Sequence, residues 1–521
     1  MMNTQYYRPE WTCGRYDSEA QIAIMYNLIE GMSYFFEEDS AKVIGALLSI
    51  PRNGQLSIQD IVLKTNISEE SLSPFFEELE EYGLCIQTYP TSQIIKAYRR
   101  KVFEQRCFQS QNEVRNTKEK LPFDISGAEM DYMNRSNGIT SVMFELTYNC
   151  SEKCIHCYNP GATRNDKEIS KRNNRQELTL GDYKRIIDEL YEKGLIRVCL
   201  SGGDPFSKPI VWEIVDYLYN KEIAFDIYTN GQRILQDTER IANYYPRLVA
   251  ISIYSGIPED HDYITRIKGS WDKSMYVLKQ LASFAVPLNL KCCVMRSNIK
   301  SYYLVKDIAK RYGAVPQFEI NITDSIEGDK CASKHLRLTP DLLEVVLRDD
   351  DVPLYVGAEA PNFGGQSKDM EKNACGAGYN SFCVSPEGFL MPCCAFHTVF
   401  GDLKKESVRH ILDESKELRW WQSLTLKQYE DCGKHSYCDY CNLCPGNNFS
   451  EWGTPLKAGE NNCYIAQNRY SLAQKMKEFS YDPLQNMSLT ERLKSLSHEK
   501  RDELKREVAH NYINQRLKVG G

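Results

Sequence analysis

Alternating strands and helices fill the middle of this chain and limit its fold more than any other feature. Helical periodicity, as at Leu180–Lys193 and Ile210–Asn220, separates short apolar runs with strand character. These runs are Val142–Leu146, Arg197–Leu200, Ala224–Tyr228, Leu248–Ile253, Leu288–Val294 and Gln317–Ile322. Six such βα units predict an α/β fold with a parallel sheet, either an open barrel or a doubly wound sheet. In both architectures the reactive groups lie beyond the carboxyl ends of the strands.

The cysteines indicate the chemistry. The chain has 521 residues and 19 cysteines, of which only three precede residue 150 and nine lie between Cys375 and Cys463. The first 13 residues have no apolar signal region, and no stretch approaches the ~20 apolar residues of a membrane span, so we expect a cytoplasmic protein without a membrane partner. Structural disulfides are disfavoured in the cytoplasm, and closely spaced cysteines therefore predict metal sites. The net charge of −7 argues against general nucleic-acid binding.

A loop directly after the first predicted strand carries Cys150, Cys154 and Cys157. Three thiolates on one short loop can hold three irons of a [4Fe–4S] cube, each thiolate taking one iron. No fourth cysteine lies nearby in the sequence, so the fourth iron would be open to another ligand. The alternatives are a zinc knuckle with a distant fourth ligand, or three incidental cysteines. The position at a strand end favours the cluster.

The segment TYNCSEKCIHCYNPG, with its complete C-x3-C-x2-C spacing, resembles the cluster loop of radical S-adenosylmethionine (SAM) enzymes. The resemblance covers roughly residues 140 to 345 and implies a partial (β/α)6 TIM-like barrel. It also implies that the methionine part of SAM chelates the open iron. An electron from the cluster would then cleave SAM to methionine and a 5′-deoxyadenosyl radical, which abstracts a substrate hydrogen.

Further motifs follow the later strands in the order that this resemblance implies. Ser201-Gly202-Gly203-Asp204-Pro205 ends the second strand and resembles the family's GGE-type motif, which contacts the SAM amino group. Asp204 stands where Glu is commoner, so that contact would come from a shorter side chain or from the backbone. The resemblance implies cofactor contacts from Gly202, Gly203, Asp204, Asn230 and Ser252, while Lys291 and Asn298 flank the fifth strand.

The nine late cysteines are similar to the SPASM extension of radical SAM peptide-modifying enzymes. Cys375, Gly388 and Cys393 match its C-x(9–15)-G-x4-C opening, and Cys441-x2-Cys444-Pro445-Gly446 resembles its closing half. The similarity implies two auxiliary [4Fe–4S] clusters. The first would take Cys375, Cys393 and Cys444, with Cys383 or an open site as fourth. The second would take Cys432, Cys438, Cys441 and Cys463. Cys394 has no assigned place.

One departure from the family pattern concerns the middle of this array. Cys432 is followed by Cys438, and His435 stands where a cysteine at x2 spacing is usual. We expect Cys438 to be the ligand; ligation by His435 is the alternative and would raise the cluster potential. A zinc-ribbon array of purely structural metal is the alternative for the whole region. The auxiliary clusters would relay electrons or shape the substrate channel.

Residues 1–105 predict a small separate unit. Two helical stretches with a break around Asn66, with Ser68 as N-cap of the second, precede an extended piece at Leu84–Tyr89, which indicates a winged helix. DNA binding is common for this pattern, but six glutamates between residues 68 and 83 have the wrong sign. A groove between a sheet and a helix can instead accept an extended peptide. The unit resembles the peptide-recognition element of radical SAM–SPASM enzymes; a purely structural cap is the alternative.

The expected order is therefore 1–105 recognition domain, 106–138 linker, 139–345 barrel, 346–465 SPASM domain and 466–521 helical tail. The resemblance implies a maturase that crosslinks (thioether or C–C) or epimerises a ribosomally made precursor peptide, with a reductant such as flavodoxin or ferredoxin. The alternatives are a maturase of a larger protein, of the sulfatase-activating or quinohemoprotein type, an iron–sulfur winged-helix DNA-binding sensor, and a zinc scaffold. The catalytic residue is unknown: Asp204, Tyr254 and His261 lie near predicted strand ends and are candidates for an acid–base group, although we expect His261 to make a structural contact.

Overall fold

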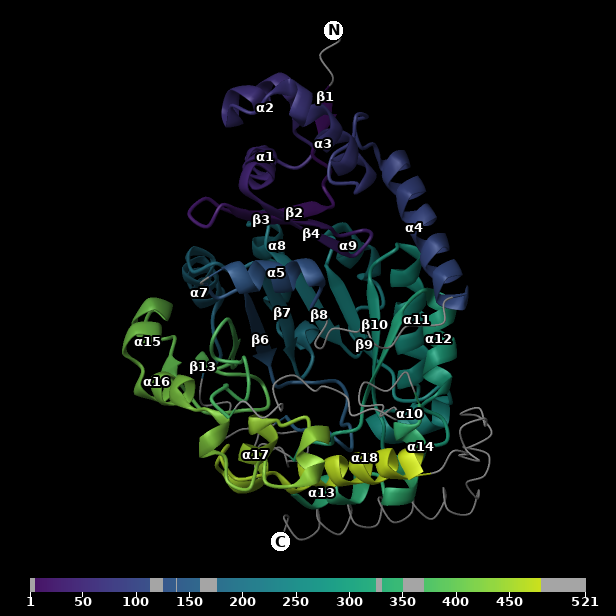
Figure 1. Ribbon diagram of the computed structural model, residues 1–521. Coiled ribbons are helices and arrows are strands. Elements are labelled where there is room, and N and C mark those ends of the chain that lie inside the picture. Colours follow the sequence, from purple (N-terminus) through teal and green to yellow (C-terminus); the bar gives the residue numbers. More distant parts are fainter. Residues whose placement is uncertain are drawn as a thin grey trace.

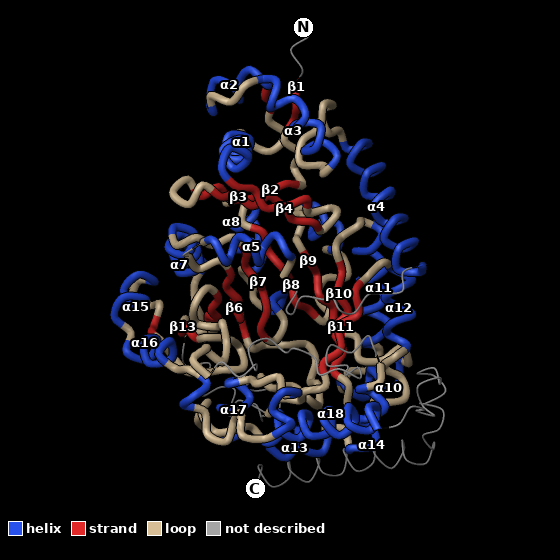
Figure 2. Tube along the Cα trace, viewed as in Figure 1, coloured by secondary structure: helices blue, strands red, loops and turns tan. Residues whose placement is uncertain are grey.

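A computed structural model of the chain describes residues 5–112, 125–136, 138–159, 176–324, 330–349 and 370–478. Six parallel strands form its centre in the order β11-β10-β9-β8-β7-β6. They are β6 (Ser141–Thr147), β7 (Arg197–Gly202), β8 (Ala224–Thr229), β9 (Leu248–Ser252), β10 (Leu288–Cys293) and β11 (Val315–Glu319). Because each strand lies beside its neighbour in the sequence, with no reversal of strand order, the sheet is the predicted partial barrel and not a doubly wound sheet (Figures 1 and 2).

The alternation of side chains along the strands separates the apolar core from the barrel interior. Val142, Phe144 and Leu146 of β6 are buried in the core that β6–β11 share with the surrounding helices, whereas Met143 and Glu145 are not part of it. The helices that follow the strands are α7 (Leu180–Glu192), α8 (Val211–Asn220), α9 (Thr238–Asn243), α10 (Pro258–Thr265), α11 (Ser270–Ser283) and α12 (Leu304–Tyr312). Since successive side chains point to opposite faces, Met143 and Glu145 face the interior.

The carboxyl-terminal region extends this sheet. β12 (Ser381–Val384) pairs in parallel with β6, and β13 (Phe389–Met391) and β14 (Gly401–Asp402) add antiparallel strands, giving nine strands among the described residues. The remaining helices of the region are α13 (Lys330–Leu336), α14 (Pro340–Leu347), α15 (Val408–Glu414), α16 (Lys416–Ser423), α17 (Pro445–Trp452) and α18 (Glu460–Glu478). α13, α14, α17 and α18 lie at one end of the barrel (Figure 1). The tail expected beyond Glu478 lies outside the described residues.

The amino-terminal unit contains the two predicted helices and a sheet that the sequence did not predict. α2 (Ile58–Thr65) ends at Asn66, which has φ of 59°, and the Ser68 hydroxyl accepts a hydrogen bond from the Ser71 amide at the start of α3 (Glu69–Glu81). The sheet is β2 (Thr12–Asp17), β3 (Ile22–Asn27) and β4 (Met32–Glu37), followed by α1 (Glu38–Leu48), and β1 (Gln5–Tyr7) pairs with β5 (Gln55–Ser57). In the expected wing, only Ile86 forms a bridge, to Tyr7.

A buried ionic network joins this unit to the amino ends of the barrel strands. α4 (Ser92–Asn112) and α5 (Gly127–Arg135) occupy part of the expected linker. Glu129 of α5 accepts a hydrogen bond from Tyr26 at 3.0 Å and lies 3.8 Å from Arg197 and 3.7 Å from Arg247, which also pairs with Asp226. Burial alone would raise the pKa of Glu129, but the two arginines hold it below its usual range. The unit therefore sits at the end of the barrel opposite the carboxyl ends of its strands (Figure 1).

Among the described residues, no helix combines the length and the apolar character that a bilayer crossing requires.

Candidate active site

The three cysteines of the first motif lie on the loop that follows β6, at the carboxyl end of the barrel. The loop is attached to α10 by hydrogen bonds from the amides of Lys153 and Ile155 to Thr265 and Ile264. Burial raises the pKa of Cys150 to about 12 and of Cys157 to about 11, and nearby acids and thiols add to the effect. Cys150 is exposed at the surface of the described residues and Cys157 is half-buried, but the acids and thiols around them favour ionised sulfur only if a cationic metal group is bound there.

The donor set of the loop fits the cluster that the sequence predicts. Cys150, Cys154 and Cys157 offer three free thiols on one short loop, and a cube takes one thiolate on each of three irons. The Asn230 amide donates to the Cys150 sulfur, as suits an ionised sulfur ligand.

The glycine pair after β7 allows the cluster loop to lie against the strand end. A Cβ at Gly202 would stand 2.3 Å from the Thr147 carbonyl oxygen, and one at Gly203 would stand 2.5 Å from that of Asn149. Gly202 also has φ of +118°, which disfavours any other residue. The two glycines thus permit a backbone contact between the β6 loop and the end of β7.

Asp204 joins two strand ends with its carboxylate. One oxygen accepts hydrogen bonds from the Thr229 hydroxyl at 2.7 Å and the Asn230 amide at 3.1 Å, and the other accepts from the Phe206 amide at 3.0 Å. The residue is fully buried. With its carboxylate engaged in this way, the arrangement favours the backbone over the Asp204 side chain as the source of a cofactor contact.

The other expected cofactor residues lie at neighbouring strand ends. The Asn230 side-chain amide lies 3.3 Å from the Cys150 sulfur, to which it donates. Ser252 closes β9 beside Lys291 of β10, whose ammonium group lies 4.7 Å from the centre of the Tyr228 ring. Asn298 is buried and donates to the carbonyl of Tyr254 at 2.7 Å. Asn230 thus contacts the cluster loop directly, and Ser252 and Lys291 lie at the carboxyl ends of their strands.

The ring of His156, in the cluster loop, packs in a row with the rings of Tyr254 and His261. The His156 ring centre lies 4.7 Å from that of Tyr254, which stacks on His261 at 5.6 Å. The Tyr254 hydroxyl lies 3.9 Å from the Cys154 sulfur. His261 Nδ1 accepts a hydrogen bond from the Tyr254 amide at 3.2 Å, and burial lowers the pKa of His261 to about 4. The His261 ring is therefore neutral near pH 7 and contacts Tyr254 through Nδ1, while its buried Nε2 has no hydrogen-bond partner among the described residues.

Glu145 is a candidate proton-transfer group that the sequence interpretation missed. It faces the barrel interior, is fully buried, and accepts a hydrogen bond from Tyr148 at 3.1 Å, while its other oxygen has no hydrogen-bond partner. Burial raises its pKa to about 8. The signal in the sequence is an acidic residue inside an apolar strand run, which is rarely buried without a reason.

The four cysteines expected to hold the second auxiliary cluster lie around one pocket. Cys432, Cys438, Cys441 and Cys463 line it together with His435. Burial raises the pKa of Cys432 to about 12, with contributions from Cys463 and Cys438. Their gathering from two separate segments fits a cluster, and His435 stays the alternative ligand.

The cysteines of the first auxiliary site also lie together. Cys393 interacts with Cys375 and Cys444, and burial raises its pKa. Its neighbour Cys394 forms a hydrogen bond with Tyr158, and Glu145 is another of its charged neighbours. Cys383, on β12, has Glu145, Cys394 and Cys393 as neighbours. Cys383 and Cys394 therefore lie between the auxiliary site and the barrel interior.

Two family models and several known proteins match the chain. Residues 144–296 match the radical SAM superfamily, and residues 375–445 match SPASM, an iron–sulfur cluster-binding domain. The antilisterial bacteriocin subtilosin biosynthesis protein AlbA of Bacillus subtilis is 25% identical over 317 residues, 58% of this chain and 66% of AlbA. The mycofactocin maturase MftC of Mycobacterium tuberculosis is 32% identical over 174 residues, 33% of this chain and 42% of MftC. The matches thus span less than two thirds of either relative.

The fold also matches a solved structure. Streptococcus suis SuiB bound to S-adenosylmethionine has a TM-score of 0.50 and 14% identity, covering 88% of this chain and 99% of SuiB. A second SuiB structure holds the precursor peptide SuiA. At this identity the likeness concerns the fold, and it agrees with the partial barrel and the carboxyl-terminal domain described above.

Proposed function

We propose, starting from the radical SAM domain and the SPASM iron–sulfur domain that this chain carries, that the protein is a radical SAM enzyme that modifies a ribosomally made peptide. The observation that carries the proposal is the position of Cys150, Cys154 and Cys157 on one loop at the carboxyl end of β6, where the residues fit a cluster. The modification would be a thioether or C–C crosslink, or an epimerisation. AlbA, MftC and SuiB, by their names and ligands, act in peptide maturation, which supports a peptide substrate.

The chain's own residues have distinct tasks in this proposal. When bound, the cluster and SAM supply the 5′-deoxyadenosyl radical. Cys150, Cys154 and Cys157 hold the cluster, and the Asn230 amide donates to the Cys150 sulfur, which favours the thiolate. Glu145, in the barrel interior, has a raised pKa of about 8 and one oxygen without a partner, so it suits proton transfer with the substrate: it accepts a proton above about pH 8 and donates one below.

The amino-terminal domain is the proposed binding site for the substrate's leader segment. β4 is an outer strand of its sheet, and α3 lies beside it, with Tyr34 stacked on Tyr82 at 4.3 Å and Phe36 against Phe75 at 5.9 Å. An extended peptide can add to an outer strand of a sheet. The six glutamates between residues 68 and 83 favour a leader with basic residues. We further propose a cytoplasmic enzyme reduced by flavodoxin or ferredoxin.

The test is the mass of the short peptide encoded beside this gene after anaerobic co-expression with the enzyme. Crosslinking removes two hydrogens, about 2 Da, whereas epimerisation leaves the mass unchanged in ordinary water and exchanges one hydrogen in heavy water. The control replaces Cys150, Cys154 and Cys157 by Ala together, and its peptide should keep the unmodified mass in both solvents. An unmodified peptide with the wild-type enzyme in both solvents would contradict crosslinking and epimerisation of that peptide.

A further inference from the structure

Five asparagines meet where the barrel joins the carboxyl-terminal domain. Asn321 follows β11, Asn447 and Asn448 lie in the first turn of α17, and Asn461 and Asn462 begin α18. Asn448 is fully buried, and Asn447, Asn461 and Asn462 are at most 5% exposed. Buried amides need hydrogen-bond partners, so the contacts between them report how the three segments are held.

The Asn462 amide connects all three segments. Its nitrogen donates to the Cys444 carbonyl at 3.5 Å and to Asn448 Oδ1 at 3.4 Å. Its oxygen accepts from the side-chain amides of Asn321 at 3.1 Å and Asn447 at 3.5 Å. Several of these contacts are long, but together they use both donors and both acceptor positions of the amide. The next residue is Cys463.

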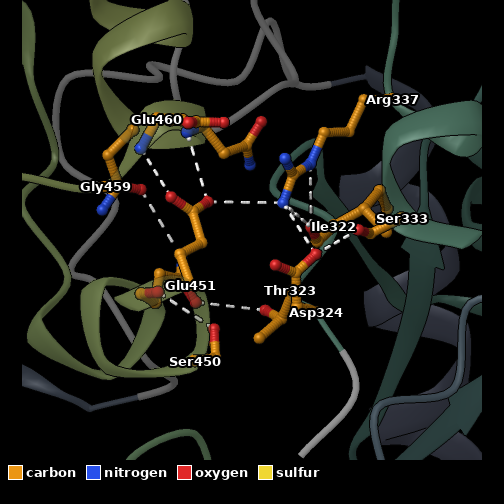
Figure 3. A network of polar contacts seen from close by, with 12 residues as sticks. Ile322, Thr323, Asp324, Ser333, Arg337, Ser450, Glu451, Gly459 and Glu460 are labelled. Carbon is orange, nitrogen blue, oxygen red and sulfur yellow. Dashed lines mark hydrogen bonds and ion pairs between the residues drawn. The ribbon is translucent and has the colours of Figure 1, made fainter. Parts of the chain in front are cut away.

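A charged network supports the same junction (Figure 3). Glu451 of α17 accepts from the Asn461 amide at 3.2 Å and pairs with Arg337 at 3.4 Å. Arg337 also pairs with Asp324 at 3.2 Å and donates to the Ile322 carbonyl at 3.1 Å. Figure 3 shows Glu451 between Arg337 and the backbone at Gly459 and Glu460. The end of the barrel and the start of α18 are thus fixed to α17 from two sides.

We propose that Asn462 is a positioning residue that holds the ligand segments of both auxiliary clusters, at Cys444 and Cys463, against the segment that follows the last strand of the barrel. The inference rests on the proposed ligand sets of the two clusters. Cys444 belongs to the first set and Cys463 to the second, and Asn462 joins the carbonyl of one to the chain position before the other. An amide suits this place because it donates and accepts at once without bringing a charge into a buried junction.

The experiment uses the full-length chain with Cys150, Cys154 and Cys157 replaced by Ala, so that only auxiliary iron remains, about eight atoms per chain for two cubes. Asn462→Leu and Asn462→Asp are then introduced separately. The measurements are the rate of iron release to a chelator and the EPR spectrum of the reduced protein. Loss of a supporting partner typically weakens a metal site about 10- to 100-fold. Asn462→Leu should therefore release iron about that much faster, with altered magnetic coupling between the clusters.

Asn462→Asp should release iron at least as fast, because it keeps the acceptors for Asn321 and Asn447 but turns a carboxylate oxygen towards the oxygens of Cys444 and Asn448 in a buried junction. Asn462→Asp also tests the positioning role of Asn462 if the Asn462→Leu protein does not fold. The matched control is Asn468→Leu in the same helix, whose amide donates to the Tyr464 carbonyl within α18 at 2.8 Å. It should leave iron release and the spectrum unchanged.

The outcomes separate this inference from the proposed function. A parent protein that holds iron, with unchanged release and spectra in both Asn462 variants, would overturn the positioning role alone. Equal acceleration in Asn468→Leu would overturn it too, since general damage to α18 would then explain the loss. A parent without auxiliary iron would overturn the ligand sets themselves and the inference with them.

Discussion

The residues at the strand ends show which part of the site can be predicted from short sequence motifs. Cys150, Asp204 and Asn230 were predictable because each belongs to a short motif directly after a strand. The roles of Glu145 and Asn462 were not, since burial and contacts with distant segments define them: Asn462 meets Asn321 across 141 residues of sequence. The engagement of the Asp204 carboxylate likewise depends on how β7 and β8 lie side by side.

His261 gives a prediction at this scale. The folded protein binds a proton at His261 only near pH 4, whereas the unfolded chain does so near pH 6.5. Stability from this residue is therefore present above pH 6.5 and is lost as the pH falls towards 4. His261→Asn removes this dependence, so the difference in unfolding free energy between wild type and variant should shrink by roughly 3 kcal/mol from pH 7 to pH 4. Anaerobic denaturant titrations at several pH values measure it.

The control for this prediction is His410→Asn. His410 is 57% exposed and pairs with Glu406 at 3.6 Å, so its replacement should change the unfolding free energy by less than about 1 kcal/mol. A constant difference between wild type and His261→Asn across this pH range would contradict the prediction.

At the scale of elements, regular periodicity decided what could be predicted. The strands of the barrel and the helices α2 and α3 follow from apolar patterns and caps. The last strand lies at Val315–Glu319, two residues before the predicted start at Gln317. Pro316 argued against a strand at this point, but β11 is an outer strand, where proline is tolerated. The sheet β2–β4 was missed because β2 shows no alternation of buried and exposed residues: it is buried at its start and half-buried after it.

Gly203 tests the contact between two of these elements. In Gly203→Ala the new Cβ would meet the backbone oxygens of Asn149 and Tyr148 at 2.5 and 2.6 Å, so the cluster loop must move. We expect loss of the barrel cluster with retention of both auxiliary clusters, that is, about four of about twelve irons per chain. Iron analysis and EPR of the anaerobic protein measure this.

Gly181→Ala is the matched control, because only the Thr179 hydroxyl lies within 4 Å of its Cβ, at 3.7 Å, and the position is helical. It should keep all iron. Full iron content in Gly203→Ala would contradict the close packing of the loop on β7.

At the scale of the whole molecule, the amino-terminal unit and the barrel are joined by buried charges. In the described network, Arg197 and Arg247 each pair with two acids, Glu129 and Asp226. Glu129→Ala removes one of these acids and leaves Asp226. Removing one member of a buried ionic network costs about 3–5 kcal/mol. We expect faster hydrogen exchange in β2–β4 and α5, with the barrel strands protected as before.

Glu104→Ala is the control, since Glu104 and its partner Arg100 are 61% and 81% exposed, and such pairs contribute below about 1 kcal/mol. Equal exchange in the two variants would mean that apolar packing, and not the charges, joins the two parts.

The amino-terminal unit lies at one end of the barrel and the cluster cysteines lie at the other. This arrangement fixes a minimum distance between the two. A single chain that contacts both ends must cover at least the length of a barrel strand, and the seven residues of β6 span about 20 Å. An extended peptide needs at least about seven residues to cover that length. If a leader segment is held on β4, as proposed above, positions closer to it than this are out of reach, and the spacing along the peptide would then help to select the residue that is changed.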